Sequence, residues 1–576
     1  MYTYTNHLLA LEANRPVVPR PTPMVGTIIT SPLIVDNWSQ ALRHHPDKRF
    51  VQYLLEGLAH GFHIGFNPDL HCIPCKSNMK SAYENPQPVD NYLQTELAAG
   101  RIVGPFLPHQ VKGAQVSSFG VIPKANQPGK WRLILDLSSP YQQSVNDGIP
   151  REFCSMRYII IDDAVEKILS VGQGCLLAKL DVEHAYRNIP VHPDDRPLLA
   201  MNWKEGIYMD TVLPFGLRSA PKIFSAVADA LEWILLGQGV SLILHYLDDF
   251  LTMGKSKSTE CQENLELIQR ICTFLGLPLK IEKLEGPTMI LTFLGIVLDT
   301  QKLEIRLPPQ KLEELNEQII EWKRKQSCTK RELLSLIGKL SHATKVVTAG
   351  RTFLRRMIET SMSVQRLNHH ISLNPDFHSD LAWWECFLPV WNSRSFMSMH
   401  EKRPEPDVVF SSDASGSWGC GAIWATRWIQ CEWQSTWVGK SIALKELLPI
   451  VLACAIWGAL WSHKRIQVLC DNAAVIEIID AKTSRCRDIM HLLRCLHFFL
   501  AYHDCTLQAV HVPGVLNVAA DAISRNRPQV LRQAVPSAQP QPDQVSQTLW
   551  KLLVVTQPDW TSVNWKALLT NYVKLA

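Results

Sequence analysis

The chain has 576 residues, of which 46% are hydrophobic and 19% are charged, and its formal net charge is +4 at pH 7. A single hydrophobic core stops growing at roughly 250–300 residues, so this length predicts several domains of an ordinary soluble type. So small a net charge neither requires nor excludes nucleic acid, because acidic sites can offset a basic groove. The 15 cysteines are scattered and odd in number, which favours reduced thiols in an intracellular protein, cytoplasmic or nuclear. The start, MYTYTNHLLALEANRP, lacks the pattern of a signal peptide.

Residues 1–85 are rich in proline, histidine and asparagine, and we assign them no chemistry. They contain an HCxxC fragment made by His71, Cys72 and Cys75. A structural zinc ion needs four ligands, and no second pair stands at the spacing of a zinc finger. The fragment is therefore interpreted as incidental.

Globular sequence is expected from Pro88 onward. VDNYLQTELAAG predicts a helix that ends at Gly100, and FGVIPK and KWRLILDL predict two strands around a turn with glycine and proline. Residues 160–255 then alternate strand-like and helix-like runs, and Ile290–Arg306 has a hairpin pattern.

Two acidic segments in this region carry the first chemical signal. Asp181 follows the apolar run CLLAKL, as at a strand end, and SLILHYLDDFLTM predicts a tight hairpin with Asp248 and Asp249 at its tip. Phosphoryl transfer uses two metal ions held by carboxylates. Because adjacent strand residues point to opposite faces, we expect Asp181 and Asp248 to be the main ligands, with Asp249 assisting. YLDD alone is a weak motif, since such short matches arise by chance.

The second half of the chain divides into a helical part and a mixed part. Residues 308–395 have leucine, isoleucine and tryptophan at helical spacing, and Glu401–Pro406 predicts a linker. Residues 407–525 predict a strand hairpin, helix, strand, helix, strand and helix, a mixed α/β domain. Residues 526–548 are rich in proline, glutamine and serine and predict a flexible linker, followed at 549–576 by the start of a truncated helical domain.

One apolar stretch in the mixed domain, Leu447–Trp461, imitates a membrane span. As a helix it would reach roughly 22 Å, short of the roughly 30 Å hydrocarbon core. Lys445 and Glu446 precede it directly. We therefore expect a buried helix and no membrane partner.

Four acids in the mixed domain carry the second chemical signal. They lie at a strand, at the start of the buried helix, at a strand end and at the start of the last helix, and they are Asp413, Glu446, Asp471 and Asp521. An acid at the start of an apolar helix is costly unless it binds something. Each alone fits a helix cap or a surface acid, but together they could hold two metal ions and direct water at a phosphodiester.

Four segments of the first half decide the identity of the first acid set: LDVEHAYRNIPV (180–191), LPFGLRSAPKIF (213–224), HYLDDFL (245–251) and TFLGIVLD (292–299). Together they resemble the reverse transcriptases of retroviruses and long-terminal-repeat retrotransposons. The resemblance implies a right-hand polymerase with fingers and palm at 86–300 and a helical thumb or connection at 301–400. It also implies two Mg²⁺ ions, which Mn²⁺ could replace, with Val182 added to the metal ligands.

The same resemblance implies nucleotide contacts. Lys124 and Arg132 would meet the incoming triphosphate, although both could be ordinary surface cations. Tyr186 stands where that family keeps an aromatic gate under the sugar, but a packed core tyrosine fits the pattern as well. Phe215 replaces the glutamine of many retroviral enzymes, which puts a polar template contact there in doubt. Lys280 and Lys283 are both candidates for the proton-donating lysine of that family. Spacing favours Lys283, and a solvated lysine is the alternative.

Basic residues of the helical region, WKRKQ (322–326), Lys345, Arg351, Arg355 and Arg356, could lie along duplex phosphates or form a solvated face. In the mixed domain, DASGSWG, ALKELL, LCDNAAV and HVPGVLNVAADAISR resemble retroelement ribonucleases H over residues 407–525. His511 has the separation of the mobile-loop histidine of the retroviral versions, but it falls at a strand end. We therefore leave it out of the catalytic set.

The expected fold is a multidomain α/β (α+β) chain, a right-hand polymerase followed by an RNase H-like domain. TKRELLSLIGKLSHATKVV, GRTFLRRMI and ADAISR resemble DIRS-type retroelements, and DWTSVNWKALLTNYVKL resembles the start of their recombinase. The expected partners are an RNA template, a DNA primer, the RNA–DNA hybrid and deoxynucleoside triphosphates. An RNA-dependent RNA polymerase is the nearest enzymatic rival, and an inactive or domesticated nucleic-acid-binding copy is the other. The priming mechanism and the oligomeric state are not predicted.

Overall fold

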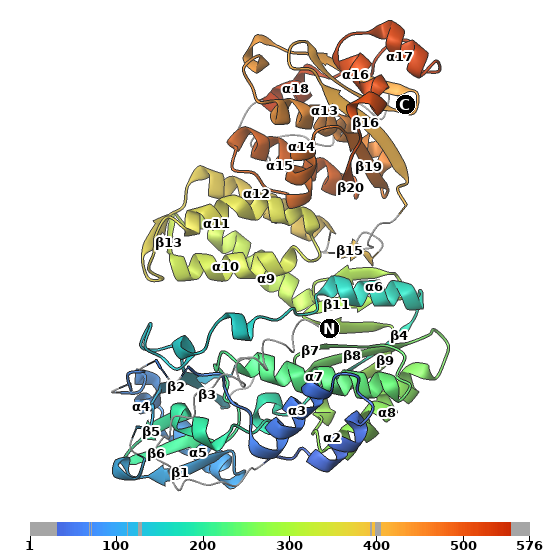
Figure 1. Cartoon of the computed structure of the whole chain (residues 1–576). Helices are drawn as coiled ribbons and strands as arrows, with labels where there is room; N and C mark the ends of the chain where they lie inside the picture. Colours follow the sequence, from blue (N-terminus) through green and yellow to red (C-terminus); the bar gives the residue numbers. More distant parts are fainter. Residues whose placement is uncertain are drawn as a thin grey trace. The chain divides into compact units, whose positions relative to one another are not determined.

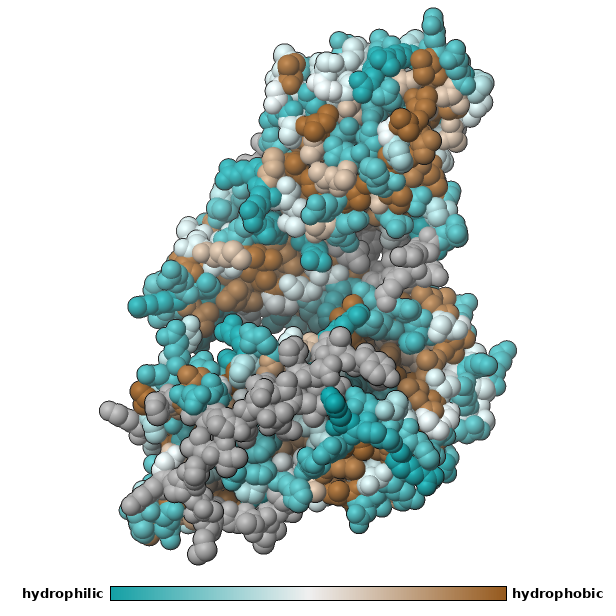
Figure 2. All heavy atoms as spheres, in the orientation of Figure 1, coloured by the Kyte–Doolittle hydropathy of each residue, from teal (hydrophilic) through white to brown (hydrophobic). Residues whose placement is uncertain are grey.

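The computed structural model describes residues 31–554, apart from 68, 71, 76, 112, 125–128, 392–393 and 398–404. The chain divides into two compact units, Met1–Leu294 and Gly295–Ala576, drawn from blue to green and from yellow to red in Figure 1. Both units mix helices and sheets, so the expected multidomain α/β class is confirmed. On the face seen in Figure 2, hydrophilic side chains cover much of both units and apolar ones form smaller patches.

Unit 1 contains the segment that the sequence predicts to form fingers and palm. Its longer helices are α2 (Val35–Leu42), α3 (Lys48–His60), α4 (Lys80–Glu84), α5 (Pro86–Ala98), α6 (Ile161–Val171), α7 (Ala220–Gly237) and α8 (Glu260–Leu275). Its strands are β1 (Ile102–Phe106), β2 (Ser118–Pro123), β3 (Trp131–Asp136), β4 (Leu176–Asp181), β5 (Ala200–Trp203), β6 (Gly206–Asp210), β7 (Ile243–Tyr246), β8 (Asp249–Gly254), β9 (Glu285–Thr288) and β10 (Ile290–Phe293).

The central sheet of unit 1 has the strand order β7-β8-β4-β9, with antiparallel neighbours. Strands β4 and β8 are apolar along most of their length because α8 and α6 pack against them, and α7 packs against β7. Most of α7 is buried, from Ala220 to Leu235, which fits its apolar sequence. The predicted β2–β3 hairpin is present, and β1, β6 and β5 form a separate sheet.

The N-terminal part differs from the expectation that globular sequence begins at Pro88. Trp38 of α2 is fully buried, and its indole N–H donates to the carbonyl of Leu275 at 3.0 Å. Phe62 is also buried, and its backbone N–H donates to the carbonyl of Pro190 at 2.8 Å. Residues from Leu33 onward therefore belong to the core of unit 1. The proline and histidine content hid these helices from an interpretation based on composition.

The HCxxC fragment lies partly outside the described residues, because His71 is not described. The thiols of Cys72 and Cys75 donate to the carbonyls of Ser144 and Ser139, at 3.3 and 3.5 Å. These backbone contacts agree with the interpretation of the fragment as incidental.

Unit 2 begins with a mainly helical region. Its helices are α9 (Pro309–Arg324), α10 (Lys330–Ala343), α11 (Arg355–Ser361) and α12 (Pro375–Trp391), and its strands are β11 (Ile296–Asp299), β12 (Glu304–Arg306), β13 (Ser327–Thr329), β14 (His370–Ser372) and β15 (Arg394–Phe396). The capping box of α10, in which Thr329 and Glu332 bond each other's backbone N–H, fixes its start. The helical spacing predicted for 308–395 is thus confirmed, with two short strand pairs added.

The C-terminal part of unit 2 is built on a mixed sheet with the order β18-β17-β16-β19-β20. Its strands are β16 (Val408–Ala414), β17 (Gly419–Trp424), β18 (Arg427–Glu432), β19 (Arg465–Cys470) and β20 (Thr506–His511). Its helices are α13 (Ile442–Trp457), α14 (Ala473–Ala481), α15 (Arg487–Tyr502) and α16 (Val518–Ser524). The first three strands are antiparallel, and β19 and β20 join β16 in parallel. This is the mixed sheet expected of an RNase H-like domain.

Two elements of this domain were not predicted. A third strand, β18, extends the hairpin, and two helices rather than one separate β19 from β20. The break between α14 and α15 follows Lys482, whose backbone is left-handed with φ of 54°.

Helix α13 is the predicted buried helix. Every residue from Leu444 to Trp457 is buried. Within the described part of the chain, the stretch Ile442–Trp461 alone is long and apolar enough to cross a membrane by length and composition, and 83% of its apolar window is buried inside the protein.

The predicted flexible linker at 526–548 is contradicted where the structure describes it. Helix α17 (Pro528–Ala534) follows α16, and the chain then returns to the edge strand β18. Asp543 forms an ion pair with Arg427 at 2.9 Å and accepts the indole N–H of Trp457 at 2.7 Å. Trp428 donates its indole N–H to the carbonyl of Gln539 at 2.9 Å. Helix α18 (Gln547–Val554) follows, and residues 555–576, where the recombinase resemblance mainly falls, lie outside the described residues.

Candidate active sites

The palm hairpin places the three predicted acids together. Leu247 takes a left-handed backbone with φ of 53°, so that Tyr246 and Asp249 pair across a two-residue turn. Strand β4 lies beside β8 in a register that sets Asp181 directly opposite Asp249. The N–H of Val182 donates to the carbonyl of Asp248 at 3.0 Å. Val182 has a buried apolar side chain, so only its backbone carbonyl could serve as a metal ligand.

Burial and the charges of neighbouring acids both act on the palm hairpin. Burial raises the pKa of Asp248, and the neighbouring charge of Asp181 raises it further. Burial also raises the pKa of Asp249, together with the charges of Asp248 and Asp181. Three crowded carboxylates of this kind fit the oxygen-rich donor set that Mg²⁺ and Mn²⁺ prefer.

Lys283 lies at this cluster. Its Nζ is 2.6 Å from Oδ2 of Asp181, and this hydrogen bond raises the lysine pKa. Lys280, the other candidate, contributes its backbone N–H to the carbonyl of Asp181 at 2.9 Å. The choice of Lys283 over Lys280 therefore agrees with the side-chain geometry, and its role as proton donor stays a prediction.

Tyr186 stands on the short helix η4 (Ala185–Asn188), a few residues after Asp181. Its ring packs 5.4 Å from that of Phe215 and 5.7 Å from that of Phe224, measured between centroids. Burial raises the pKa of its hydroxyl, and the charge of Asp248 adds to the effect. Phe215 itself is 61% exposed. An aromatic surface thus lies close to the three palm acids, and the role of Tyr186 as a gate stays a prediction.

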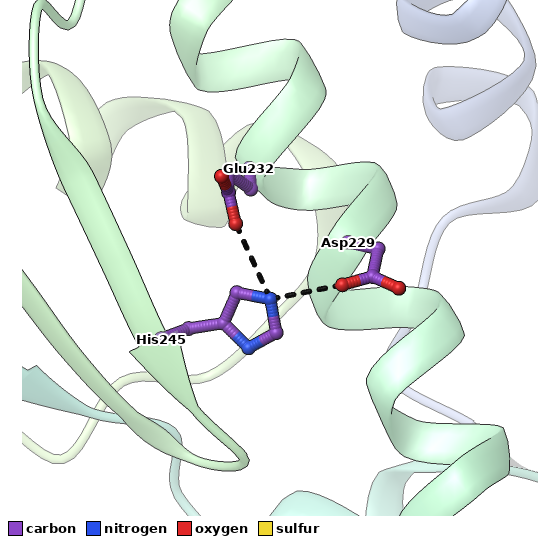
Figure 3. A group of neighbouring side chains, drawn as sticks. All are labelled: Asp229, Glu232 and His245. Carbon is purple, nitrogen blue, oxygen red and sulfur yellow. Dashed lines mark hydrogen bonds and ion pairs between the residues drawn. The ribbon is translucent and has the colours of Figure 1, made fainter. Parts of the chain in front are cut away.

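His245 connects the palm hairpin to helix α7 (Figure 3). Sequence reasoning did not single out this residue. Its Nε2 lies 3.0 Å from Oδ1 of Asp229 and 3.3 Å from Oε2 of Glu232, both on α7. Its ring stacks on Phe250 at 5.4 Å. Burial raises the pKa of Glu232, and His245 opposes that shift. The strand that leads to Asp248 is thus fastened to α7.

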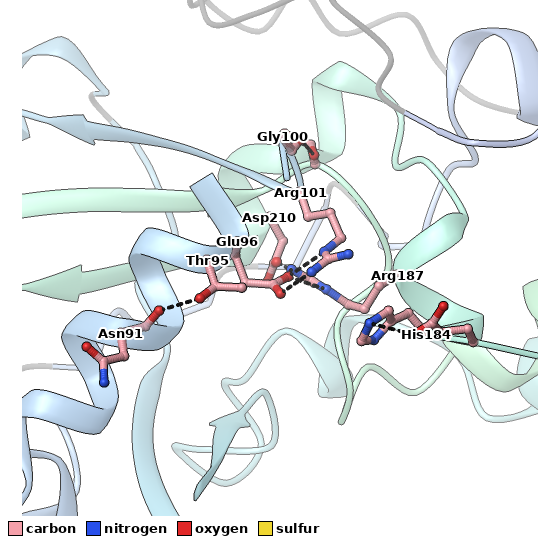
Figure 4. Close-up of polar contacts among 10 residues, drawn as sticks. Asn91, Thr95, Glu96, Gly100, Arg101, His184, Arg187 and Asp210 are labelled. Carbon is pink, nitrogen blue, oxygen red and sulfur yellow. Dashed lines mark hydrogen bonds and ion pairs between the residues drawn. The ribbon is translucent and has the colours of Figure 1, made fainter. Parts of the chain in front are cut away.

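Arg187, next to Tyr186, belongs to a buried charge network (Figure 4). Its guanidinium is 2.6 Å from Glu96 of α5 and 2.5 Å from Asp210 of β6. Glu96 also pairs with Arg101 at 2.7 Å, so two arginines balance two acids. Removing one member of such a network would leave an uncompensated buried charge. The network therefore holds the segment of Tyr186 against α5 and β6.

Lys124 and Arg132 lie on the fingers hairpin. Lys124 follows β2, and its backbone N–H donates to the carbonyl of Lys130 at 2.8 Å, while Arg132 is an exposed residue of β3. Among the described residues, no hydrogen bond or ion pair joins either side chain to the palm acids. Their triphosphate contacts therefore stay predictions.

The mixed domain brings its four predicted acids together near the carboxyl ends of the neighbouring strands β16 and β19. Asp413 lies on β16 and Asp471 directly follows β19, and these two strands are parallel neighbours. Glu446 lies early in α13, and Asp521 lies in the first turn of α16. Ligand atoms of Glu446, Asp471 and Cys470 all lie within 4.8 Å of one another.

Glu446 is the most perturbed of these acids. Burial and the charges of Asp413 and Asp471 raise its pKa to about 9. Its Oε2 is buried and has no hydrogen-bond partner among the described residues. An orphaned carboxylate oxygen facing other acids is expensive, and a divalent cation would satisfy it. The donor set therefore fits a metal centre.

Three neighbours of this centre were missed by sequence reasoning. The hydroxyl of Ser524 donates to Asp413, which lowers the aspartate pKa against the larger effect of burial. Arg525 pairs with Asp521 at 2.5 Å. A Cβ at Gly514 would lie 3.0 Å from Oδ2 of Asp471, so the turn at that residue runs close to the acid. The helical spacing of Ser524 and Arg525 after Asp521 is the signal that could have found two of them.

His511 ends β20, opposite Cys470 in the sheet register. The side chain is exposed. It thus lies at a strand end, as the sequence indicated, and its exclusion from the catalytic set stays a prediction.

Comparison with known proteins gives the class of the first unit. Residues 122–298 match the family described as "Reverse transcriptase (RNA-dependent DNA polymerase)". This segment contains the palm acids, Tyr186, Phe215 and Lys283. This segment of the chain is therefore similar to reverse transcriptases.

Two curated relatives extend the likeness to retroelement polyproteins. The "Retrovirus-related Pol polyprotein from transposon opus" of Drosophila melanogaster is 21% identical over 511 residues, covering 84% of this chain and 48% of the relative. The "Enzymatic polyprotein" of Cestrum yellow leaf curling virus is 26% identical over 271 residues, covering 46% of this chain and 39% of the relative. This chain thus spans about half or less of the length of these relatives. The similarity of the chain therefore extends to polyproteins of a transposon and a virus.

Among solved structures, that of the foamy viral protease–reverse transcriptase in complex with RNA/DNA hybrid is similar over 85% of this chain and 64% of that chain. The sequence identity is 16% and the TM-score is 0.47.

Proposed function

We propose that this chain is an RNA-directed DNA polymerase with RNase H activity, which copies retroelement RNA into DNA and degrades the RNA strand of the hybrid. The observation that carries the proposal is the register of the palm sheet, which sets Asp249 opposite Asp181 and ties Asp248 to Val182. The match of the surrounding segment to the reverse transcriptase family supports the same activity.

Both acid clusters fit divalent cations, Mg²⁺ or Mn²⁺ in its place. The polymerase ions would be held by Asp181, Asp248, Asp249 and the carbonyl of Val182, and the nuclease ions by Asp413, Glu446, Asp471 and Asp521. When bound, two ions per site activate the attacking oxygen and stabilise charge on the phosphate.

The residues around the palm acids prepare the nucleotide. Tyr186 and Phe215 offer a ring surface for the sugar, and the network of Arg187 with Glu96 and Asp210 holds that surface still. We assign Lys283 the delivery of a proton to the leaving group, because its ammonium already lies at Asp181. Lys124 and Arg132 would neutralise the triphosphate.

In the nuclease site, Ser524 and Arg525 orient carboxylates by hydrogen bonding. Ser524 holds Asp413, and Arg525 holds Asp521. One buried carboxylate oxygen of Glu446 has no hydrogen-bond partner among the described residues. The partners of the whole protein would be an RNA template, a DNA primer, the hybrid and deoxynucleoside triphosphates, in the cytoplasm or the nucleus.

The finer identity belongs to the same proposal. The segments TKRELLSLIGKLSHATKVV and ADAISR support an origin in a DIRS-type element. Similarity to retroelement polyproteins supports the broader class only.

Primer extension on an RNA template tests the function. The purified chain should extend a DNA primer with deoxynucleotides when Mg²⁺ is present and stop when the metal is chelated, because the palm acids alone cannot stabilise the phosphate charge. Re-addition of Mg²⁺ should restore extension. A chain that binds the primer–template but never extends it in Mg²⁺ or Mn²⁺ would instead be an inactive, domesticated nucleic-acid-binding protein.

A further inference from the structure

A cavity of about 600 Å³ lies in unit 2, and none of its lining residues belongs to either acid cluster. Residues of α11, α12, the segment before α15 and α15 itself line it. This volume is within the range of protein sites that bind small molecules. Five arginines contribute to its lining: Arg355, Arg356, Arg485, Arg487 and Arg494.

Three of these arginines have acidic partners inside the protein. Arg355 pairs with Glu359 at 2.6 Å. Arg356 and Arg494 share the fully buried Asp380, at 3.5 and 3.1 Å. Arg356 also lies 3.5 Å from Asp376, so these inner charges balance.

The other two arginines are different. Arg485 and Arg487 are exposed, and neither forms an ion pair with any residue that the structure describes. The remaining acid of the lining, Asp488, is already engaged by Lys440 at 2.5 Å. The cavity therefore presents two uncompensated guanidinium groups.

Neutral donors add to this positive lining. The hydroxyl of Ser484 accepts the N–H of Cys486 at 3.2 Å, which leaves its own hydrogen available to donate. Asn374 uses its side-chain oxygen as acceptor for the N–H of Phe377 at 2.9 Å, so its amide NH₂ remains available to donate. The side chain of Cys486, the residue before α15, forms no capping hydrogen bond with this helix. The N-terminal end of the 16-residue helix, which carries the positive end of its dipole, adjoins the cavity.

We propose that this cavity binds phosphate groups of the nucleic-acid backbone, with Arg485 and Arg487 as the principal ligands. Guanidinium groups bind phosphate oxygens through paired hydrogen bonds, and such contacts position a duplex without reading its sequence. The Lys440–Asp488 ion pair joins the start of α15 to the segment that leads into α13, the helix of Glu446. The site would therefore position the hybrid for the nuclease centre. The inference rests on the proposed function for its nucleic-acid partner.

The test is the salt dependence of hybrid binding by the full chain. The double variant Arg485→Ala/Arg487→Ala should bind an RNA–DNA hybrid more weakly than the wild type, measured by fluorescence anisotropy over a series of salt concentrations. The slope of log K against log salt should fall in magnitude by about 1.8, or about 0.9 for each phosphate that the protein no longer neutralises. Both arginines are exposed, so thermal unfolding should not change.

The matched control is Arg43→Ala/Arg49→Ala, which removes two exposed arginines from unit 1. Its slope should equal that of the wild type. An unchanged slope in Arg485→Ala/Arg487→Ala would overturn the proposal. A second result would also overturn it: the double variant loses the binding of inorganic tripolyphosphate, measured by calorimetry, but binds the hybrid as the wild type does. The cavity would then bind a free anion instead of the nucleic-acid backbone.

Failure of this proposal is separate from failure of the function. A wild type that extends primers while the double variant keeps the wild-type slope rejects the phosphate site alone. A wild type that never extends a primer, with a slope that falls in the double variant, rejects the polymerase and supports the site.

Discussion

At the scale of single residues, two neighbours in the chain have different contacts at the proposed nucleotide site. Tyr186 directs its ring to Phe215 and Phe224, while Arg187 directs its guanidinium to Glu96 and Asp210. A short helix can carry both because adjacent residues leave it in different directions. The position of the ring is thus set by buried ion pairs rather than by its own contacts alone.

Tyr186→Val should change the choice of sugar. A 2′-hydroxyl entering beneath the nucleotide would overpack the ring, at a cost of roughly 1–3 kcal/mol, or about ten- to a few-hundred-fold in kcat/KM. The smaller side chain should admit ribonucleotides, while deoxynucleotide use falls only modestly. The measurement is the ratio of kcat/KM for dGTP over GTP in both proteins. A ratio that does not move would reject the gate and favour an RNA polymerase.

At the scale of elements, residues 526–554 belong to the C-terminal domain instead of linking it to something else. Proline and glutamine suggested a linker, because composition reports the absence of a core-forming pattern. It cannot report that Asp543 meets Arg427 and the indole N–H of Trp457 across a long separation in the chain. Contacts of this kind depend on the tertiary fold.

Asp543→Ala should therefore destabilise the C-terminal domain. It leaves the Arg427 guanidinium and the Trp457 indole without their partner, and each unsatisfied group costs about 1–3 kcal/mol. Urea unfolding should show the loss. The control Asp504→Asn removes the charge of the half-exposed partner of His463 and keeps a residue type that tolerates the left-handed backbone there, with φ of 52°. It should change stability by less than about 0.5 kcal/mol. Equal effects of the two substitutions would show that 526–554 is only loosely attached.

Features encoded by neighbouring residues could be predicted from the sequence, and features encoded across the chain could not. Strand ends and turn residues placed Asp181, Asp248 and Asp471 correctly, because period-two patterning and turn chemistry are local. The partners of Arg187 and Ser524 come from distant parts of the chain, so no local pattern contains them. The N-terminal helices were missed for the opposite reason, since unusual composition masked a local amphipathic pattern around Trp38.

At the scale of the whole molecule, the two units carry separate acid clusters, one for each proposed chemistry. The stability of unit 2 also depends on buried neutral histidines. Burial lowers the pKa of His491 to about 4 and of His497 to about 3. As pH falls, these histidines take up protons at a higher pH in the unfolded chain than in the folded one. Their contribution to the free energy of unfolding is therefore complete above about pH 6.5 and is lost as pH falls toward the folded pKa.

His497→Leu should weaken this pH dependence. Between about pH 7.5 and about pH 5, its unfolding free energy should fall by about 2 kcal/mol less than that of the wild type, at 1.36 kcal/mol for each pH unit below about 6.5. Glu446 and Asp380, whose raised carboxyl pKa acts in the opposite sense, are the same in both proteins. Urea unfolding at both pH values measures the difference. Identical pH dependence in the two proteins would mean that His497 is not buried in its neutral form.

The most direct test of two separate catalytic centres follows both activities in one reaction. An RNA template labelled at one end is annealed to a DNA primer carrying a second label, and extension and RNA cleavage are measured together in Mg²⁺. Asp248→Asn should lose at least about a hundredfold in extension, equivalent to about 2.7 kcal/mol of lost transition-state stabilisation, and keep RNA cleavage. Glu446→Gln should show the reverse. Extension by Asp248→Asn at the wild-type rate, or a parallel loss of both activities in either variant, would contradict the account.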